Sequence, residues 1–372
     1  MSQIGIIAIG RNEGERLRQC LTSVVGRGWP VVYVDSASTD GSAALARAMG
    51  AEVVDLDMSI PFSAARARNE GISRLLAIAP EVQYVQMVDG DCEVVAGWID
   101  RAKQELDANP QTAVVCGRRR ERFPNASIYN RIADIEWNTP IGEAKSCGGD
   151  AMFRISAFQQ AGGYDNTVVA GEEPELCQRL REKGWKVFRI DAEMTIHDSA
   201  MLRFGQWWKR SVRSGYGAMD VATRFRRGKD GLFVKQVKSA RMWVLTASLI
   251  AWLTFGVTSG VLIAWPLGMS MHQVSVSKFD GWLELIILIA AALPFIFLIA
   301  TIAQVMRIAK RVHARVPSWY TSAAYGVLTM IGKWANYRGQ RQYVRDRRAG
   351  KLTRMIDYKN AGVQAVGPMA AD

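Results

Sequence analysis

The sequence predicts an α/β fold with a mostly parallel, Rossmann-like sheet, followed by an α-helical membrane region. Two observations lead to this prediction. Apolar runs of strand length alternate with helical patterns through the first half of the 372 residues, and such alternation is typical of a parallel sheet flanked by helices. Two longer runs without any charged residue follow, from Met242 to Met271 and from Leu285 to Met306. Each exceeds the roughly 20 apolar residues that a membrane-spanning helix needs.

The expected elements of the first half follow one another in a regular order. Strands are expected at residues 4–9, 31–34, 53–56, 84–88, 113–116 and 186–190, and helices at 14–25, 42–49, 64–76, 97–106 and 173–183. A less regular region, residues 121–165, lies between the fifth strand and the last helix. The carboxyl ends of parallel strands meet at one edge of a sheet, where open α/β folds bind ligands. Polar residues that directly follow these strands are therefore the first candidates for a functional site.

The strand expected at residues 84–88 ends in two carboxylates one residue apart, Asp89 and Asp91. Hard oxygen ligands at this spacing suit a divalent cation, Mg²⁺ or Mn²⁺, held together with a substrate diphosphate. An Asp-Gly turn that caps the next helix explains the same residues equally well when they are taken alone. Three further polar segments at neighbouring strand or helix ends favour a binding site, and they are residues 10–13, 35–42 and 65–71.

In this order the motifs resemble those of family 2 glycosyltransferases, which have the GT-A nucleotide-binding fold. The resemblance covers residues 3–235, about two thirds of the chain, and the motifs are specific as a set although each is short. The matching segments are residues 7–13, 34–42, 67–71, 89–91, 147–154, 162–165 and 171–180. The remaining third, with its two apolar runs, resembles the membrane anchor that some relatives carry.

The resemblance implies which residues bind the nucleotide part of a nucleoside-diphosphate sugar. Asn12 and Glu13 are expected to shape the pocket for the base and the ribose, and Asp35 is expected to accept hydrogen bonds from the nucleobase. Uridine is the base expected on family grounds, with guanosine and thymidine as alternatives.

A divalent-cation site is implied by the same resemblance. Asp91 is expected to ligate the Mg²⁺ or Mn²⁺ ion that bridges the diphosphate, and Asp89 to contact the ion, its water shell or the ribose. His197 stands where some relatives place a third metal ligand, although a lone histidine is more often structural. Arg68 is expected to compensate phosphate charge or, alternatively, to pair with Glu70 or Asp89.

An inverting transferase needs a general base that takes the proton from the acceptor hydroxyl, on the side opposite the leaving diphosphate. Relatives usually supply this base as the aspartate of a Glu-Asp pair, and here the pair is Glu172-Glu173. We expect Glu173 to be the base, because it stands at the position of that aspartate and repulsion between adjacent carboxylates raises a pKa. Glu172 is the alternative, although an acid at a helix start is also explained by its interaction with the helix dipole. Asp150 is the next candidate if neither glutamate is the base.

Basic residues flank the two apolar runs and account for much of the net charge of +12. The loop between the runs carries a single basic residue, Lys278, so the positive-inside rule places both ends of the chain in the cytoplasm. Anionic lipid headgroups explain the basic clusters better than nucleic acid does. A third stretch, residues 317–334, fits a helix that lies in the membrane interface. No signal peptide is recognised at the start of the chain, which agrees with a cytoplasmic first domain.

These expectations divide the chain into four parts. They are a catalytic domain at 1–200, an amphipathic interfacial segment at 201–240, a membrane region at 241–335 with spans at about 242–266 and 284–306, and a basic cytoplasmic tail at 336–372. Aromatic residues set among arginines in the second part are typical of a membrane-surface segment, and packing onto the globular domain is the alternative. The five cysteines are scattered and form no CxxC pair, so neither a disulfide framework nor a zinc site is expected.

The sequence therefore predicts a metal-dependent glycosyltransferase at the cytoplasmic (inner) membrane. It would move one sugar from a nucleoside-diphosphate sugar to a lipid-linked or membrane-proximal glycan acceptor. A processive polysaccharide synthase is an alternative, because residues 206–210 are similar to the Gln-x-x-Arg-Trp motif of such enzymes, but the match is imperfect and two spans are too few for a channel. This segment is expected to form a surface helix whose Arg210 or Arg213 reaches the diphosphate. A non-catalytic binding protein on the same fold is the third hypothesis.

Overall fold

The computed structural model describes residues 3–225, 231–270 and 280–350, and the chain forms two compact units. The first unit, Met1–Val234 with Gly339–Asp372, contains a nine-stranded sheet, and the second, Lys235–Arg338, is helical. The strands are β1 Ile4–Gly10, β2 Val31–Asp35, β3 Glu52–Asp55, β4 Tyr84–Asp89, β5 Cys92–Val94, β6 Thr112–Glu121, β7 Gly142–Glu143, β8 Ala151–Arg154 and β9 Lys186–His197.

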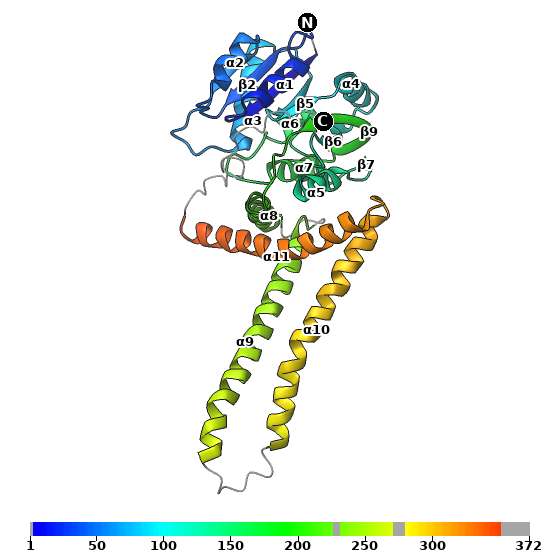
Figure 1. The fold of residues 1–372 in the computed structure, drawn as a ribbon. Coiled ribbons are helices and arrows are strands. Elements are labelled where there is room, and N and C mark those ends of the chain that lie inside the picture. Colours follow the sequence, from blue (N-terminus) through cyan, green and yellow to red (C-terminus); the bar gives the residue numbers. More distant parts are fainter. Residues whose placement is uncertain (1–2, 226–230, 271–279, 351–372) are drawn as a thin grey trace, which may run out of the picture. The chain divides into compact units, whose positions relative to one another are not determined.

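Helices cover both faces of the sheet (Figure 1). They are α1 Glu15–Val24, α2 Ser42–Ala48, α3 Ala64–Ile78, α4 Trp98–Ala108, α5 Ile128–Trp137, α6 Ile155–Gln160, α7 Glu172–Glu182 and α8 Phe204–Arg224. Three long helices follow, α9 Val234–Ser270, α10 Asp280–His313 and α11 Trp319–Arg348.

The sheet has the strand order β3-β2-β1-β4-β8-β6-β9-β5, with β7 on β9. The first four strands pair in parallel, and so do β6 and β9. The antiparallel strand β8 joins β4 to β6, and the short strands β5 and β7 run antiparallel to β9. The sheet is therefore mixed but mostly parallel, and the predicted fold class is confirmed.

The register of the parallel strands aligns three strand ends at one edge of the sheet. Gly10 at the end of β1 pairs with Asp35 at the end of β2, and Ile9 pairs with Asp89 at the end of β4. Because these strands are buried on both faces, their register is fixed by the core. The polar loops after them are consequently brought to one edge, as the sequence predicts.

Helix α3 is held close to the sheet by glycines on both sides of the contact. An added Cβ at Gly71 would lie 2.6 Å from Cγ2 of Ile7, and one at Gly5 would lie 2.5 Å from Cδ2 of Leu75. Side chains at either glycine would therefore push the helix away. The close approach fixes the N-terminal turns of α3, and with them Arg68, at the carboxyl edge of β1 and β4.

The irregular region predicted at residues 121–165 is more ordered than the sequence suggests. It contains α5, β7, β8 and α6, and β8 takes a central place in the sheet. Strand β5 was not predicted either, and β6 and β9 are longer than expected. Strands of two to four residues are too short to show an alternating pattern, and in β9 the polar residues Asp191 and Glu193 interrupt the apolar run.

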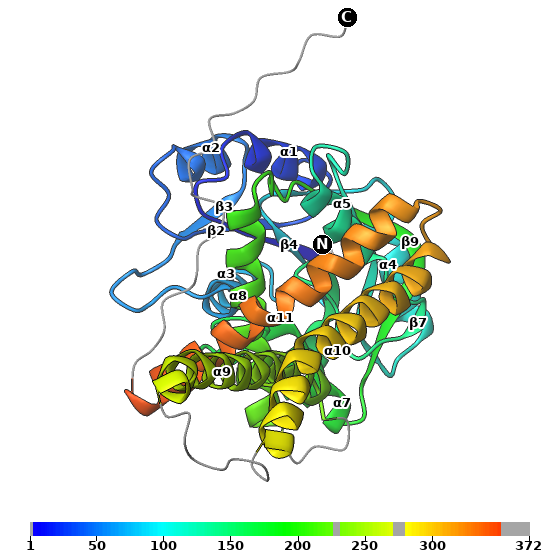
Figure 2. The ribbon, with the colours of Figure 1, turned by 60° about the horizontal axis from the view of Figure 1, so that its bottom comes forward.

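Helix α8 packs onto the sheet domain, which was one of the two alternatives for this amphipathic segment. Trp207, Val212 and Tyr216 are buried, and an added Cβ at Gly217 would lie 2.5 Å from the carbonyl oxygen of Ala170. The last turns of α11 lie against α8 (Figure 2), where an added Cβ at Gly339 would overlap the carbonyl oxygen of Val212.

The second unit contains two helices long and apolar enough to cross a membrane, within the described residues. Their candidate spans are Val234–Gly260 and Leu285–His313, and only 6% of each apolar window is buried. Contacts between the helices include Trp243 with Phe297, at 5.5 Å between ring centroids, and a hydrogen bond from Thr254 Oγ1 to the carbonyl oxygen of Ala290 at 3.3 Å. Helix α11 is longer than the helix expected at 317–334. Lys278 and the end of the predicted basic tail lie outside the described residues.

Candidate active site

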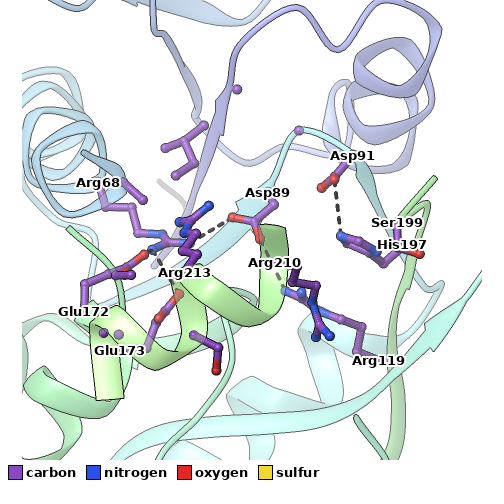
Figure 3. A pocket seen from close by; sticks show the side chains of 18 of the residues that line it. Arg68, Asp89, Asp91, Arg119, Glu172, Glu173, His197, Ser199, Arg210 and Arg213 are labelled. Atoms are coloured by element: carbon purple, nitrogen blue, oxygen red, sulfur yellow. Dashed lines mark hydrogen bonds and ion pairs between the residues drawn. The ribbon is translucent and has the colours of Figure 1, made fainter. Parts of the chain in front are cut away.

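A cavity of about 490 Å³ opens at the carboxyl edge of the sheet (Figure 3). Its walls come from the ends of β1 and β4, the residues beside β5, and the first turns of α3 and α7, and one face of α8 closes the remaining side. Of the predicted site residues, Glu13, Arg68, Asp89, Asp91, Glu172, Glu173, His197, Arg210 and Arg213 line it. The topology therefore brings together side chains that lie up to 200 positions apart in the sequence.

Arg68 connects the two acidic sides of the cavity. Its guanidinium is 2% exposed and donates to Asp89 Oδ1 at 2.8 Å and to Glu172 Oε1 at 2.9 Å, while Glu173 Oε1 lies 3.1 Å away. The predicted pairing with Asp89 is therefore present, whereas Glu70 is exposed and not among these partners. One buried cation thus offsets three carboxylates that would otherwise repel each other.

Asp89 is held by a second arginine that the sequence analysis did not identify. Arg119 of β6 lies 3.4 Å from Asp89 Oδ2 and 2.7 Å from Asp150 Oδ2. Burial alone would raise the pKa of Asp89, but Arg68 and Arg119 lower it below its usual value. Asp89 is therefore an ionised carboxylate between two guanidinium groups, as Figure 3 shows.

Asp150 is a structural carboxylate. It is fully buried and accepts hydrogen bonds from the backbone N–H of Asp89 at 3.0 Å and from Thr195 Oγ1 at 2.6 Å, in addition to its contact with Arg119. A base for an acceptor hydroxyl must be reachable from the cavity, and Asp150 does not line it. Among the described residues, Glu172 and Glu173 of α7 are therefore the better-placed candidates, because both line the cavity.

We expect Asp150→Ala to lower the free energy of unfolding by about 3–5 kcal/mol, because it leaves the buried charge of Arg119 without its nearest partner. Urea unfolding of the purified full chain, followed by circular dichroism, would measure the change. The exposed Asp191 provides the matched control, since Asp191→Ala removes the same group from the neighbouring strand surface. Equal stability of the two variants would show that Asp150 does not hold Arg119 as described.

Asp91 and His197 form a second polar pair on the other side of Asp89. Strand β5 pairs with β9 so that Cys92 is opposite His197, and this register places His197 Nε2 3.2 Å from Asp91 Oδ2. Burial would lower the pKa of His197, but the carboxylates of Asp91 and Glu121 raise it above its usual value.

This pair fits a divalent cation. Carboxylate oxygens are preferred by Mg²⁺ and Mn²⁺, and imidazole is the commonest nitrogen ligand in metal sites. Both residues are buried and line the cavity wall. The thiol of Cys92 lies beside Asp91 and His197. Burial and the carboxylate of Asp150 raise the pKa of this thiol far above its usual range, so it stays protonated and is a poor metal ligand.

Glu172 and Glu173 open helix α7 at the far side of the cavity. The helix begins after Gly171, whose positive φ of 85° suits a residue without a Cβ, and both carboxylates face Arg68 (Figure 3). The side chain of Glu173 is 15% exposed and that of Glu172 is 5% exposed. Burial and the neighbouring charge of Glu172 raise the pKa of Glu173 to about 7, against the opposing effect of Arg68. A carboxylate in this range suits a general base.

The predicted nucleotide-binding residues divide into two groups. Glu13 lines the cavity, whereas Asn12 and Asp35 do not. Asn12 accepts a hydrogen bond from the backbone N–H of Thr39 at 2.7 Å and so ties the first two loops together. Asp35 accepts from the backbone N–H of Ser38 at 2.7 Å and from Tyr33 at 3.1 Å. In this structure both residues shape the loops beside the cavity.

One stripe of α8 faces the cavity and carries both arginines that the sequence analysis identified. Its members are spaced three and four positions apart, as on one face of a helix, and they are Arg210, Arg213, Ser214, Gly217 and Ala218. Arg210 pairs with Glu136 at 3.1 Å. Arg213 makes no ion pair with any residue that the structure describes, so its charge is available to an anion.

Arg119, Glu121 and Trp137 were not predicted from the sequence as residues of the site. Arg119 stands in a run of three arginines at the end of β6, and alternation along a strand sends only the middle one toward the site. Its neighbours Arg118 and Arg120 pair with Asp134 and Glu193 instead. The three consecutive arginines are therefore recognisable in the sequence, but their pattern alone does not show which of them lines the cavity.

The fold and the cavity define an α/β protein with a polar cavity at the carboxyl edge of its sheet. Two family models match the chain. The one described as Glycosyl transferase family 2 matches residues 6–159, and the one described as Glycosyl transferase family group 2 matches residues 111–309, more than half of the chain. The chain belongs to glycosyltransferase family 2.

Two curated proteins illustrate the similarity at the level of sequence. The chain is 24% identical over 267 residues to a pre-mycofactocin glycosyltransferase of Mycobacterium tuberculosis, covering 68% of this chain and 52% of that protein. It is 25% identical over 199 residues to the succinoglycan biosynthesis protein ExoA of Rhizobium meliloti, covering 49% of this chain and 57% of that protein. The chain thus spans about half the length of the curated relatives it matches.

Among solved structures, the chain is similar to a mannosyltransferase from Pyrobaculum calidifontis in complex with GDP-Man and Mn²⁺. The TM-score is 0.48 at 18% sequence identity, and the match covers 78% of this chain and 86% of that one.

Proposed function

We propose that the chain is a membrane-anchored, metal-dependent inverting glycosyltransferase. It would transfer a single sugar from a nucleoside-diphosphate sugar, with uridine as the expected base, to a lipid-linked or membrane-proximal glycan acceptor. One observation carries this proposal. A single cavity holds an Asp–His pair that suits a divalent cation and, on its other side, a glutamate with a pKa of about 7.

The charges of the cavity support binding of a diphosphate. Six arginines line it, Arg11, Arg16, Arg68, Arg119, Arg210 and Arg213, and guanidinium groups match phosphate oxygens in charge and geometry. Arg213 and Arg11 are best placed to accept a new anion, because neither makes an ion pair with a residue that the structure describes. Arg119 already pairs with Asp89 and Asp150. A diphosphate that contacts Arg119 would therefore compete with these two carboxylates.

Asp91 and His197 would hold the divalent cation, and Asp89 would contact its water shell or the ribose from its place between two arginines. When bound, the cation neutralises the diphosphate that leaves in the reaction. Asp91 is expected to contribute the charge and His197 the neutral nitrogen.

Glu173 would act on the acceptor. Its carboxylate would accept the proton of the acceptor hydroxyl while that oxygen forms a bond to the anomeric carbon and the bond from this carbon to the diphosphate breaks. Burial in the cavity wall keeps the pKa of Glu173 close to neutral, so the group is able to take a proton near pH 7. Arg68 would keep its carboxylate in place.

The helical unit supports a membrane-proximal acceptor. Its two long apolar helices are almost entirely exposed, which argues against core helices of a soluble protein and favours contact with lipid. The relative named for succinoglycan biosynthesis acts in making a polysaccharide, by its name, and this favours a glycan acceptor. Two spans per chain favour transfer of one sugar over extrusion of a polymer.

We expect the catalytic unit and the basic end of the chain to lie on the same, cytoplasmic side of the membrane, because basic residues are concentrated outside the loop between the spans. Reporter fusions after residue 234 and at the carboxyl terminus should report the cytoplasm, and a fusion within residues 271–279 should report the opposite side. A carboxyl terminus on the outside would mean that residues 317–334 also cross the membrane.

The function is tested by offering the purified full chain a panel of nucleoside-diphosphate sugars with Mn²⁺ and measuring release of the nucleoside diphosphate. We expect hydrolysis of one class of donor, with Asp91→Asn inactive. Polymer formed from the donor alone would instead identify a processive synthase. Donor binding without turnover, with or without added lipid-linked acceptors, would identify a non-catalytic binding protein.

A further inference from the structure

His197 lies between two carboxylates that come from different strands. Strands β6, β9 and β5 are neighbours in this order, and their register pairs Glu121 with His197 on one side and Cys92 with His197 on the other. As a result Nε2 of His197 lies 3.2 Å from Asp91 Oδ2, and Nδ1 lies 3.7 Å from Glu121 Oε2. The two ring nitrogens therefore face two different acids, and only Asp91 belongs to the cavity wall.

Glu121 is buried and its carboxylate is held in one orientation. Oε1 accepts hydrogen bonds from the backbone N–H of Phe123 and from Asn130 Nδ2, each at 3.2 Å. Oε2 accepts from the backbone N–H of Ser199 at 3.2 Å and is the oxygen that faces His197. These three donors direct one oxygen toward the imidazole.

The imidazole is held as well, and one of its nitrogens is available to Glu121. The indole of Trp137 packs against the ring edge-on, with 4.8 Å between the ring centroids. Nδ1 is buried and makes no hydrogen bond with any residue that the structure describes. Glu121 Oε2 is the carboxylate oxygen beside it, and a small rotation of the ring would bring the two atoms to hydrogen-bond distance.

We propose that Glu121 is the positioning residue of His197, accepting the Nδ1–H so that the lone pair of Nε2 points at the cation site beside Asp91. The proposal rests on the cation site of the proposed function. A carboxylate that accepts from the far nitrogen of a metal-binding histidine fixes its tautomer and ring orientation, and it makes the other nitrogen a stronger ligand. Losing such a partner typically weakens metal affinity by about 10–100-fold.

The test measures Mn²⁺ affinity of the purified, EDTA-treated full chain by electron paramagnetic resonance of the free ion, without any sugar donor. Glu121→Gln should weaken Mn²⁺ binding by about 10–100-fold. Glu193→Gln is the matched control, because it removes the same charge from β9, where Glu193 pairs with exposed Arg120. The control should bind Mn²⁺ as the wild type does.

A double-mutant cycle separates positioning from a general structural role. In a His197→Ala background, Glu121→Gln should have no further effect on Mn²⁺ affinity. If it weakens binding equally in both backgrounds, Glu121 acts on the fold and not through His197. Unchanged affinity of the single Glu121→Gln variant would also overturn the proposal.

Two further variants keep the outcome decisive. If Glu121→Gln does not fold, Glu121→Asp replaces it, because this substitution moves the carboxylate away from the imidazole and keeps the charge. Glu121→Asp must then show the same loss of Mn²⁺ affinity, and this loss must again depend on His197. Asp91→Asn tests the cation site itself. If the wild type does not bind Mn²⁺, or if Asp91→Asn leaves Mn²⁺ binding unchanged, the cation site is rejected together with the role of Glu121. Loss in Asp91→Asn with normal binding in Glu121→Gln would reject only the latter.

Discussion

Asp91→Asn is expected to reduce sugar transfer by about 10³-fold or more while the chain remains folded, because a metal ion stabilises the charge of a leaving diphosphate by several kcal/mol. The substitution keeps the size of the side chain and removes the charge that faces His197. The measurement is the turnover of the donor identified in the panel, together with Mn²⁺ affinity.

Asp191→Asn is the control for this prediction, since Asp191 is an exposed residue of β9 away from the cavity. It should leave both turnover and Mn²⁺ affinity unchanged. Wild-type rates in Asp91→Asn, or full activity of the wild type in EDTA, would contradict a cation at this position.

Glu173→Gln should lower turnover by about 10²–10⁴-fold, the usual cost of losing a positioned general base. Glutamine preserves the length and the hydrogen-bonding capacity of the side chain but does not accept the proton. Donor affinity should survive, because Glu173 is expected to act on the acceptor. The measurement is single-turnover transfer at saturating donor, with donor affinity determined in parallel.

Glu172→Gln is the matched variant and should have a much smaller effect. Glu172 is nearly inaccessible and accepts a hydrogen bond from Arg68 at 2.9 Å, so we expect it to support Arg68. If Glu172→Gln proves to be the inactive variant and Glu173→Gln the active one, the roles are reversed. Activity in both would place the base elsewhere among the residues of the cavity.

The pH dependence of the reaction gives an independent check on Glu173. Because its pKa is raised to about 7 by burial and by Glu172, the group is protonated and unable to act as a base below that pH. The value of kcat/KM should therefore rise with pH through the region near 7 and level off above it. Glu173→Gln should remove this rise. A profile that is the same in both proteins would assign the titration to another group.

Much of the site could be predicted because the parallel strands make sequence position informative. A buried strand that ends in Asp89 must present that residue at the carboxyl edge, and the register with β1 then brings it beside the loop that contains Glu13. Arg68 could be placed there from its position in the first turns of the following helix. The order of the motifs and the pattern of strands therefore both place the site at the carboxyl edge of the sheet.

The remaining parts depend on contacts that no local pattern shows. Strand β8 is a four-residue strand that joins the two parallel halves of the sheet, and its pairing partners lie 37 or more positions away. Asp150 was the next candidate base after Glu172 and Glu173, yet it is fully buried beside Arg119 and does not line the cavity. Glu121 was missed because its relation to His197 arises from strand register alone.

The two faces of α8 have a consequence for protein engineering. One face lines the cavity through Arg210 and Arg213, and the other supports the end of α11, where Tyr216 packs edge-on against Tyr343. A soluble enzyme made by stopping the chain before the apolar helices would lose this support and expose the back of the helix that carries the arginines. Deleting only α9 and α10, and joining the chain through a linker that retains residues 339–348, would keep the end of α11 packed against α8.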